Sequence, residues 1–148
     1  MEFNELIENF AERHNVADLV AYGNAASLDI DGIIVTIVAS GDKVILSADL
    51  GEPPAEGAAK FADLLLEASL QTDAFFGKAS ESGDYIIVRR LTLQVLDVDA
   101  FDAALESLVN QTETWRRLLA DYRPVAKAAA ERAEAERSSF GSTGFMQV

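Results

Sequence analysis

The sequence predicts an α+β fold in which a twisted antiparallel sheet of about five strands packs against three main helices. Three observations support this prediction: an amphipathic helical pattern at the start of the chain, a series of short β-rich runs joined by turns, and two later helical patterns with another strand between them. The 148 residues match the length of one domain, and 49% of them are apolar, so a single core can form.

The first helix is predicted from apolar residues at helical spacing with glutamates between them. These apolar residues form one face of about three turns: Phe3, Leu6, Ile7 and Phe10. Acidic side chains near the N-terminus of a helix are favoured by its dipole. Either Asn15 or Gly23 is expected to end the helix.

Residues 27–50 are predicted to form a three-stranded antiparallel meander. The pair Asp31-Gly32 lies between two β-rich runs and is a strong signal for a two-residue hairpin. A second turn is expected at Ser40-Gly41-Asp42. Asp29 and Asp31 are two residues apart, so we expect them to project from the same face of a strand.

The second helix is expected to begin at Pro54 or Ala55, because proline is tolerated in the first turn. The following strand, residues 85–93, is apolar on both faces at its centre, Ile86-Ile87-Val88. A strand of this kind is covered on both sides, either within its own domain or by another subunit.

A third helix is predicted to begin after an aspartate cap, Asp97 or Asp99, and to end or kink at Pro124. We therefore divide the chain into an α+β domain, residues 1–122, and an extension, residues 123–148. The extension is Ala-rich and helix-prone at first, and from Ser138 onward we expect a flexible tail.

Charge and composition exclude several classes of function. Twelve Lys and Arg stand against 25 Asp and Glu, so the net charge of −13 repels nucleic acids and anionic membranes. The start of the chain lacks a basic leader, and the longest early uncharged run is too short to cross a membrane. The absence of cysteine excludes disulfides, thiolate zinc sites and thiol nucleophiles. We expect no nucleic-acid partner and no membrane partner.

Residues with catalytic or metal-binding chemistry are few. Asp29, Asp31 and Asp49 could together hold a hard cation, but no EF-hand spacing or histidine accompanies them, so solvent-facing carboxylates are the stronger interpretation. His14 is the only histidine, and no nucleophile motif surrounds any serine. We predict no catalytic residue, no metal site and no cofactor.

Two further features have two interpretations each. The pair Arg89-Arg90 interrupts an apolar strand, which indicates either an edge or partly exposed strand, or a pairing with a carboxylate across an interface. Trp115 must pack somewhere, and packing in the core is favoured over contact with a partner.

The order of elements resembles that of class I type III secretion chaperones, the Tir chaperone (CesT-like) family, over roughly residues 2–120. The resemblance rests on a turn, a helical run, two strands and the spacing of the last helix: Leu50-Gly51-Glu52-Pro53, Leu64 to Ser69, Phe75-Phe76-Gly77, Tyr85 to Leu91, and Phe101, Leu105, Leu108, Val109, Trp115, Arg116 and Leu118. Ser69 stands where the family often has asparagine, and the segment from Pro124 onward extends beyond the common core.

The resemblance implies a non-enzymatic homodimer in the bacterial cytoplasm. Such a chaperone holds the extended N-terminal segment of a secreted effector, keeps it soluble and export-competent, and releases it at the secretion ATPase. An extended peptide of this kind adds a strand to a sheet edge and places alternate side chains in apolar pockets. The residues expected to bind the effector are Phe3, Leu6, Phe10, Leu28, Ile30, Val35 and Ile37, each with a core role as the alternative. The residues expected at the dimer interface are Phe61, Leu65, Ala68, Phe75, Ile86 and Val88.

Two other functions remain open at this point. The first is a general protein-binding adaptor of the same fold outside secretion, and an effector gene beside this one would favour the chaperone over it. The second, less favoured, is a small acid-dependent or metal-dependent enzyme. Metal content of the purified protein, and loss of activity on replacing Asp29 and Asp31 by alanine, would identify such an enzyme.

Overall fold

A computed structural model describes residues 2–16 and 19–146, with side chains described as far as Ser138. Its elements follow the order α1 (Phe3–His14), β1 (Val20–Tyr22), β2 (Ala25–Ile30), β3 (Ile33–Ser40), β4 (Lys43–Gly51), α2 (Ala58–Ser69), β5 (Phe75–Lys78), β6 (Tyr85–Thr92), a short 3-10 turn (Leu93–Val95) and α3 (Val98–Met146). The strands form one antiparallel sheet in the order β1-β2-β3-β4-β6-β5. The predicted α+β class is confirmed.

The sheet has six strands where about five were expected. The strand that the sequence did not indicate is β1, whose three residues are all exposed. A strand that short and that exposed leaves no alternation of apolar and polar residues for sequence reasoning to detect. β1 pairs only with β2, so it forms one edge of the sheet.

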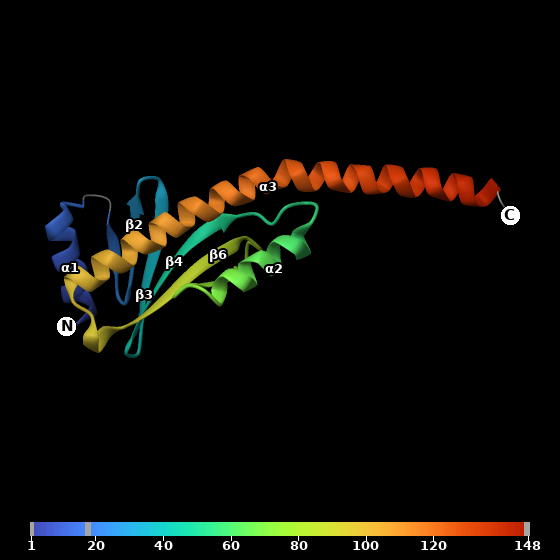
Figure 1. Cartoon of the computed structure of the whole chain (residues 1–148). Helices are drawn as coiled ribbons and strands as arrows, with labels where there is room; N and C mark the ends of the chain where they lie inside the picture. Colours follow the sequence, from blue (N-terminus) through green and yellow to red (C-terminus); the bar gives the residue numbers. More distant parts are fainter. Residues whose placement is uncertain (1, 17–18, 147–148) are drawn as a thin grey trace.

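All three helices lie on one face of the sheet, and α3 crosses the strands diagonally with α1 near one end and α2 near the other (Figure 1). Alternate strand residues point toward these helices and are fully buried, among them Val35, Ile37, Val44, Leu46 and Ile87. The helices cover them with Leu6, Phe10, Phe61, Phe101, Leu105 and Leu108. Side chains on the other face of the sheet are more exposed, as Ile34 shows with 60%.

The hairpins of the meander form as predicted. Asp31 and Gly32 both have positive φ, 53° and 85°, which a type I′ turn requires at its two central residues. The strands β2, β3 and β4 lie in consecutive antiparallel register, so the prediction for residues 27–50 is confirmed. Asn15 ends α1 in the left-handed conformation, and Asp97 caps α3 by accepting a hydrogen bond from the Ala100 backbone at 2.7 Å.

The second helix begins at Ala58, so the prediction that Pro54 or Ala55 opens it is wrong. Side chains of α3 hold the connection before α2 in a non-helical path. The Arg123 guanidinium donates to the carbonyls of Glu52 and Pro53, and the Tyr122 hydroxyl donates to the Gly57 carbonyl at 2.8 Å. Gly57 then takes a left-handed conformation, φ 71°, and α2 starts after it.

The third helix continues through Pro124 to Met146, so Pro124 does not end it. Proline removes one backbone donor, but packing on both sides of it, by Leu119 and Ala126, keeps the helix on the body of the protein. The segment predicted as a flexible tail has a helical backbone from residue 138 to 146, and residues 147–148 lie outside the described residues.

We expect Gly57→Ala to destabilise the fold by more than the roughly 1–2 kcal/mol that a left-handed alanine costs. An added Cβ would lie 2.5 Å from the Tyr122 hydroxyl oxygen, so it also disrupts the contact that holds α2 to α3. Gly41→Ala is the matched control, because Gly41 has φ 60° and nothing within 4 Å of the added atom. Urea unfolding of both variants measures the difference, and equal losses would contradict the role of this contact.

Candidate functional site

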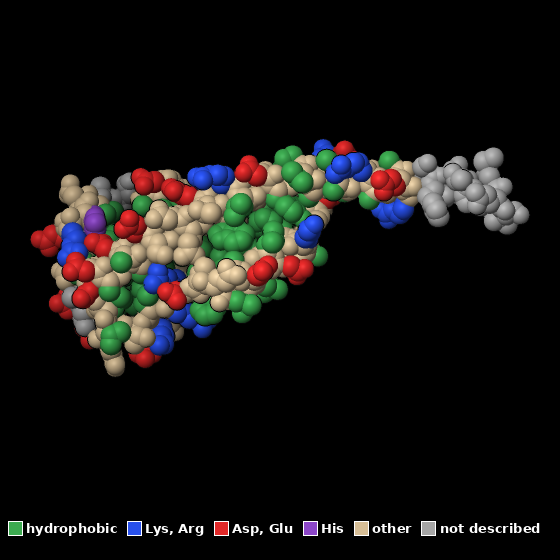
Figure 2. Space-filling model, in the orientation of Figure 1, with side chains coloured by type: hydrophobic (Ala, Val, Ile, Leu, Met, Phe, Trp, Pro, Cys, Tyr) green, Lys and Arg blue, Asp and Glu red, His purple; other side chains and the backbone are tan. Residues whose placement is uncertain are grey.

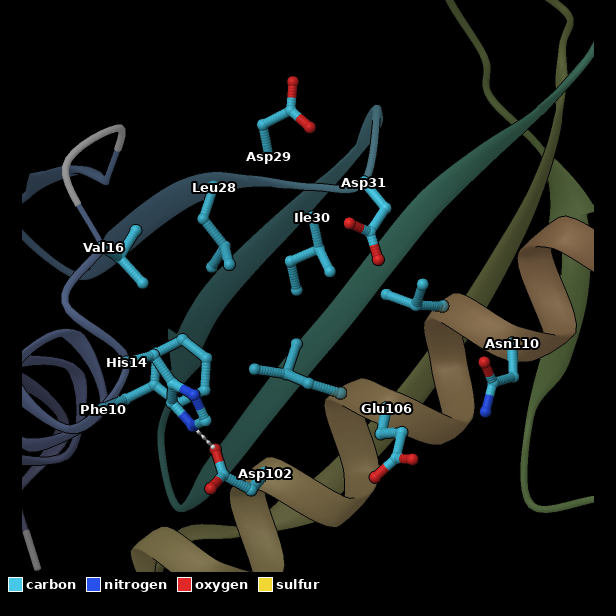
Figure 3. Close-up of a pocket in the computed structure, with 12 residues that line it drawn as sticks. Phe10, His14, Val16, Leu28, Asp29, Ile30, Asp31, Asp102, Glu106 and Asn110 are labelled. Carbon is cyan, nitrogen blue, oxygen red and sulfur yellow. Dashed lines mark hydrogen bonds and ion pairs between the residues drawn. The ribbon is translucent and has the colours of Figure 1, made fainter.

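An open hollow of about 550 Å³ lies where the end of α1, strand β2 and the first turns of α3 meet. We call it the α1–α3 hollow, and Figure 3 shows its lining. Three elements that are far apart in the sequence contribute to it, with the residues Phe10, His14, Val16, Leu28, Asp29, Ile30, Asp31, Asp102, Leu105, Glu106, Val109 and Asn110.

The floor of this hollow is apolar. Strand alternation turns Leu28 and Ile30 toward the helices, and the i, i+4 spacing on α3 places Leu105 and Val109 on the same side. Phe10 closes the floor from α1 and packs edge-to-face on Phe101 with 5.3 Å between ring centroids. Phe10, Leu28, Leu105 and Val109 are at most 5% exposed, so Ile30 supplies most of the apolar surface that this floor offers to solvent.

The rim of the hollow is acidic. Asp31 points toward the hollow, while the Asp29 carboxylate points away from it (Figure 3) and accepts a hydrogen bond from the Gly32 backbone at 2.8 Å. The prediction that the two aspartates project the same way is therefore wrong. β2 ends at Ile30, and the left-handed Asp31 in the turn interrupts the alternation of the strand. Glu106 and Asp102 complete the rim from α3.

A charged cluster joins α1 to α3 at one end of the hollow. Arg13 donates to Asp99 at 2.6 Å and to Asp102 at 3.1 Å, and His14 Nε2 lies 2.6 Å from Asp102 Oδ1. The hydrogen bonds to Asp99 and Asp102 raise the pKa of the Arg13 guanidinium further above its usual value. The His14 ring also packs on Phe10, with 4.6 Å between centroids. The only histidine is thus part of a helix-to-helix contact.

A second hollow, of about 500 Å³, lies on the other side of α1 beside the edge strand β1. Phe3 and Ile7 from α1 and Leu19, Ala21 and Tyr22 from the edge of the sheet line it. Both hollows therefore border α1, and the second opens next to unpaired strand backbone.

The seven residues predicted to bind an effector fall into three groups. Phe10, Leu28 and Ile30 line the α1–α3 hollow, and Phe3 lines the second hollow. The other three, Leu6, Val35 and Ile37, have no exposed surface. Phe3, Phe10 and Leu28 are also buried in the core, so Ile30 is the one predicted residue whose side chain is partly exposed. The sequence could not separate these groups, because pocket and core residues share the same apolar periodicity. The acidic rim on α3 was also missed, since nothing in the sequence places it opposite β2.

A third depression, of about 580 Å³, runs between α2 and α3, and Figure 2 shows hydrophobic side chains gathered in it. We call it the α2–α3 groove. Two of the residues predicted at a dimer interface, Phe61 and Ala68, line it. Leu65 is buried in the core, and the strand register places Phe75, Ile86 and Val88 on the face of the sheet away from the helices. The groove also contains exposed residues that the prediction did not include: Leu64, Leu118 and Val125.

The ambiguous residues have partners within the chain. Trp115 packs edge-to-face on Phe76 and Phe61, with centroids 5.2 and 6.0 Å apart, and its exposed side lines the groove. β5 pairs with β6 only as far as Val88, so at Arg89 and Arg90 strand β6 pairs with β4 alone. Arg89 is partly exposed and Arg90 is exposed, which agrees with the interpretation of an edge or partly exposed strand. Arg89 approaches Asp73 at 3.8 Å, and Arg90 lies over the Phe75 ring.

Two searches of the described residues bear on other classes of protein. No described helix has both the length and the apolar character that crossing a bilayer requires. In the described part of the chain, no three acidic or histidine side chains are grouped so that they could hold a metal ion.

Open apolar hollows beside a free strand edge are typical of domains that bind segments of other proteins. The chain belongs to the Tir chaperone protein (CesT) family, whose pattern it matches over residues 5–116. The resemblance predicted from the sequence is therefore confirmed. A comparison with curated proteins finds no significant match.

Several solved structures share the fold of this chain. A chain of the ExsC–ExsE complex is 25% identical, with a TM-score of 0.69 over 78% of this chain and 92% of that chain. A chain of the HopA1–SchA chaperone–effector complex is 17% identical, with a TM-score of 0.66 over 78% of this chain and 93% of that chain. A chain of the complex between the Yersinia pestis type III secretion chaperone SycH and a stable fragment of YscM2 is 14% identical. Its TM-score is 0.63 over 77% of this chain and 99% of that chain.

We expect Asp102→Asn to destabilise the protein more than Asp99→Asn does, because His14 loses its carboxylate partner and Arg13 keeps only Asp99. Asp99→Asn is the matched control, since Asp99 is 83% exposed and pairs with Arg13 alone. Urea unfolding near pH 6 measures both variants. An equal, negligible loss in the two would show that the cluster does not hold α1 to α3.

Proposed function

We propose that this protein is a type III secretion chaperone that binds the extended N-terminal segment of a secreted effector and keeps it soluble and export-competent. The observation that carries the proposal is the α1–α3 hollow, where partly exposed Ile30 lies over a buried apolar floor beside an acidic rim. Membership of the Tir chaperone protein (CesT) family supports it, as does the fold shared with chains of chaperone–effector complexes.

The mode of binding follows from the geometry of the two hollows. No described strand pairs with the outer edge of β1, so this edge can pair with an added strand. Every second side chain of such a strand points to the helix side of the sheet. The second hollow lies there, with Phe3 at its wall, and the α1–α3 hollow lies on the other side of α1.

The acidic rim adds a charge preference to this binding mode. Asp31 and Glu106 flank the apolar floor, and neither has an ion-pair partner among the interactions described. A segment that presents an apolar side chain next to lysine or arginine complements both parts of the hollow. We infer that the effector segment carries this combination.

The proposal assigns no catalytic activity. The only histidine, His14, is held by Asp102, and no serine or threonine hydroxyl is hydrogen-bonded to it in the described structure. We further propose that the protein acts as a homodimer in the bacterial cytoplasm and delivers its effector to the secretion ATPase, as expected of a class I chaperone. The exposed apolar surface of the α2–α3 groove supports the dimer.

The direct test is co-purification from the native host while secretion is switched on. We expect one or a few secreted proteins, each retained through its N-terminal region. Recovery of the chaperone with no secreted protein under these conditions would overturn the proposal in favour of an adaptor outside secretion.

Ile30→Asn is expected to weaken binding of the captured N-terminal segment at least tenfold, or about 1.4 kcal/mol, since Ile30 provides apolar surface to the hollow. The matched control is Ile34→Asn. Ile34 lies on β3 opposite Asp29, its side chain is on the other face of the sheet, and it is 60% exposed. Isothermal titration calorimetry compares the two. Unchanged affinity in a folded Ile30→Asn protein would remove the hollow from the binding surface.

The double variant Asp31→Asn, Glu106→Gln is expected to bind the same segment roughly fivefold less tightly at low salt, from about 1 kcal/mol of lost attraction. The difference should shrink as salt rises, because exposed charges are screened. Asp29→Asn is the control, since its side chain points away from the hollow (Figure 3). A loss of affinity that is independent of salt would contradict the electrostatic role of the rim.

A further inference from the structure

The α2–α3 groove exposes several large apolar side chains to solvent. Leu64 on α2 is 43% exposed, and Leu118 and Val125 on α3 are 46% and 64% exposed. The aromatic rings of Phe61 and Trp115 form its floor. A contiguous apolar surface of this kind marks an interaction site.

The same face of α3 continues beyond the body of the protein. From Lys127 to Ser138 every residue except Ala130 is exposed, and this arm projects away from the sheet (Figure 1). Val125 borders the groove and also a shallow surface on the arm, formed with Ala128, Glu131, Arg132 and Ala135. The groove and this face of the arm are therefore continuous.

We propose that the α2–α3 groove holds the α3 arm of a second copy of the chain, with the two α3 helices antiparallel about a two-fold axis at Val125. In such a pair, the residue n positions before Val125 in one copy lies opposite the residue n positions after Val125 in the other copy. Trp115 then faces Ala135 of the second copy, and Tyr122 faces Ala128.

Side-chain size supports this pairing. The two bulky rings at the groove, Trp115 and Tyr122, meet alanines on the arm, so the helices can approach closely without a clash. Ten residues separate Val125 from both Trp115 and Ala135, about 15 Å of helix, so the arm spans the α3 side of the groove. Two-fold symmetry fills both grooves at once.

Charge supports the same occupant. Within the arm, residues 127–138, three Lys and Arg balance three Glu, so the arm is neutral in a chain whose net charge is −13 and meets little repulsion from a second copy. Arg132 faces Leu118 in the pair, which places it one helical turn from Asp121 of the second copy. Glu67 lies across the groove on α2. The cation of the arm thus enters a groove bordered by two carboxylates.

This interface rests on one part of the proposed function, the homodimer, and specifies which surfaces of the two copies meet. It does not depend on effector binding. It also gives the extension, residues 123–148, a role separate from that of the proposed chaperone domain, residues 1–122.

The test is sedimentation of the full chain without effector over a range of concentrations. We expect a wild-type dimer, and for Ala128→Glu a dimer at least tenfold weaker, because glutamate is larger than alanine and adds charge beside Asp121. Ala130→Glu is the matched control: it changes the same residue type about 200° around the helix and should dimerise like the wild type. Circular dichroism checks that both variants keep their helices.

A charge exchange tests the register. Arg132→Glu and Asp121→Arg should each weaken the dimer, and the two together should restore it, since the pair is then re-formed with opposite signs. No recovery in the double variant would overturn the antiparallel register.

The outcomes separate this inference from the proposed function. A dimer of equal strength in Ala128→Glu and Ala130→Glu would overturn the arm interface and leave effector binding at the α1–α3 hollow standing. A wild-type chain that is monomeric at every concentration would also overturn it, whereas failure of effector binding by an intact dimer would overturn only the chaperone proposal.

Discussion

Packing of α3 against the helix-facing side of the sheet is the contact on which the rest of the structure depends. Phe101, Leu105 and Leu108 are fully or almost fully buried against strand residues such as Leu46. The other two helices attach to α3 as well as to the sheet. α1 does so through the Arg13 and His14 cluster, and α2 through the aromatic contacts of Phe61 with Trp115 and Tyr122.

This arrangement leaves apolar surface open at the two places where a shorter helix meets α3. At one end the hollow beside α1 has an acidic rim close to its floor, and at the other the groove beside α2 is mostly apolar, with Glu67 and Asp121 at its border. The two surfaces suit different partners, because a charged rim selects a basic peptide whereas a broad apolar groove suits a stable subunit contact. One helix thus organises the proposed effector site and the proposed dimer contact on opposite parts of its length.

Sequence reasoning succeeded where local chemistry decides the structure. The apolar spacing of Phe3 to Phe10 indicated α1, and the Asp31-Gly32 pair indicated the first hairpin, since positive φ at both positions suits few other residues. It failed where distant residues decide. The start of α2 depends on hydrogen bonds from Tyr122 and Arg123, more than 60 residues away, and the continuation of α3 past Pro124 depends on packing.

The sequence by itself determined the fold class, the meander, the family and the set of apolar residues from which a binding surface is drawn. Only the tertiary structure decided that Ile30 borders an open hollow while Val35 and Ile37 are enclosed in the core. The physical reason is that periodicity specifies which face of a strand is apolar, whereas exposure depends on where a covering helix ends. α1 ends at His14 and α3 crosses the sheet at an angle, and the space between them is the site.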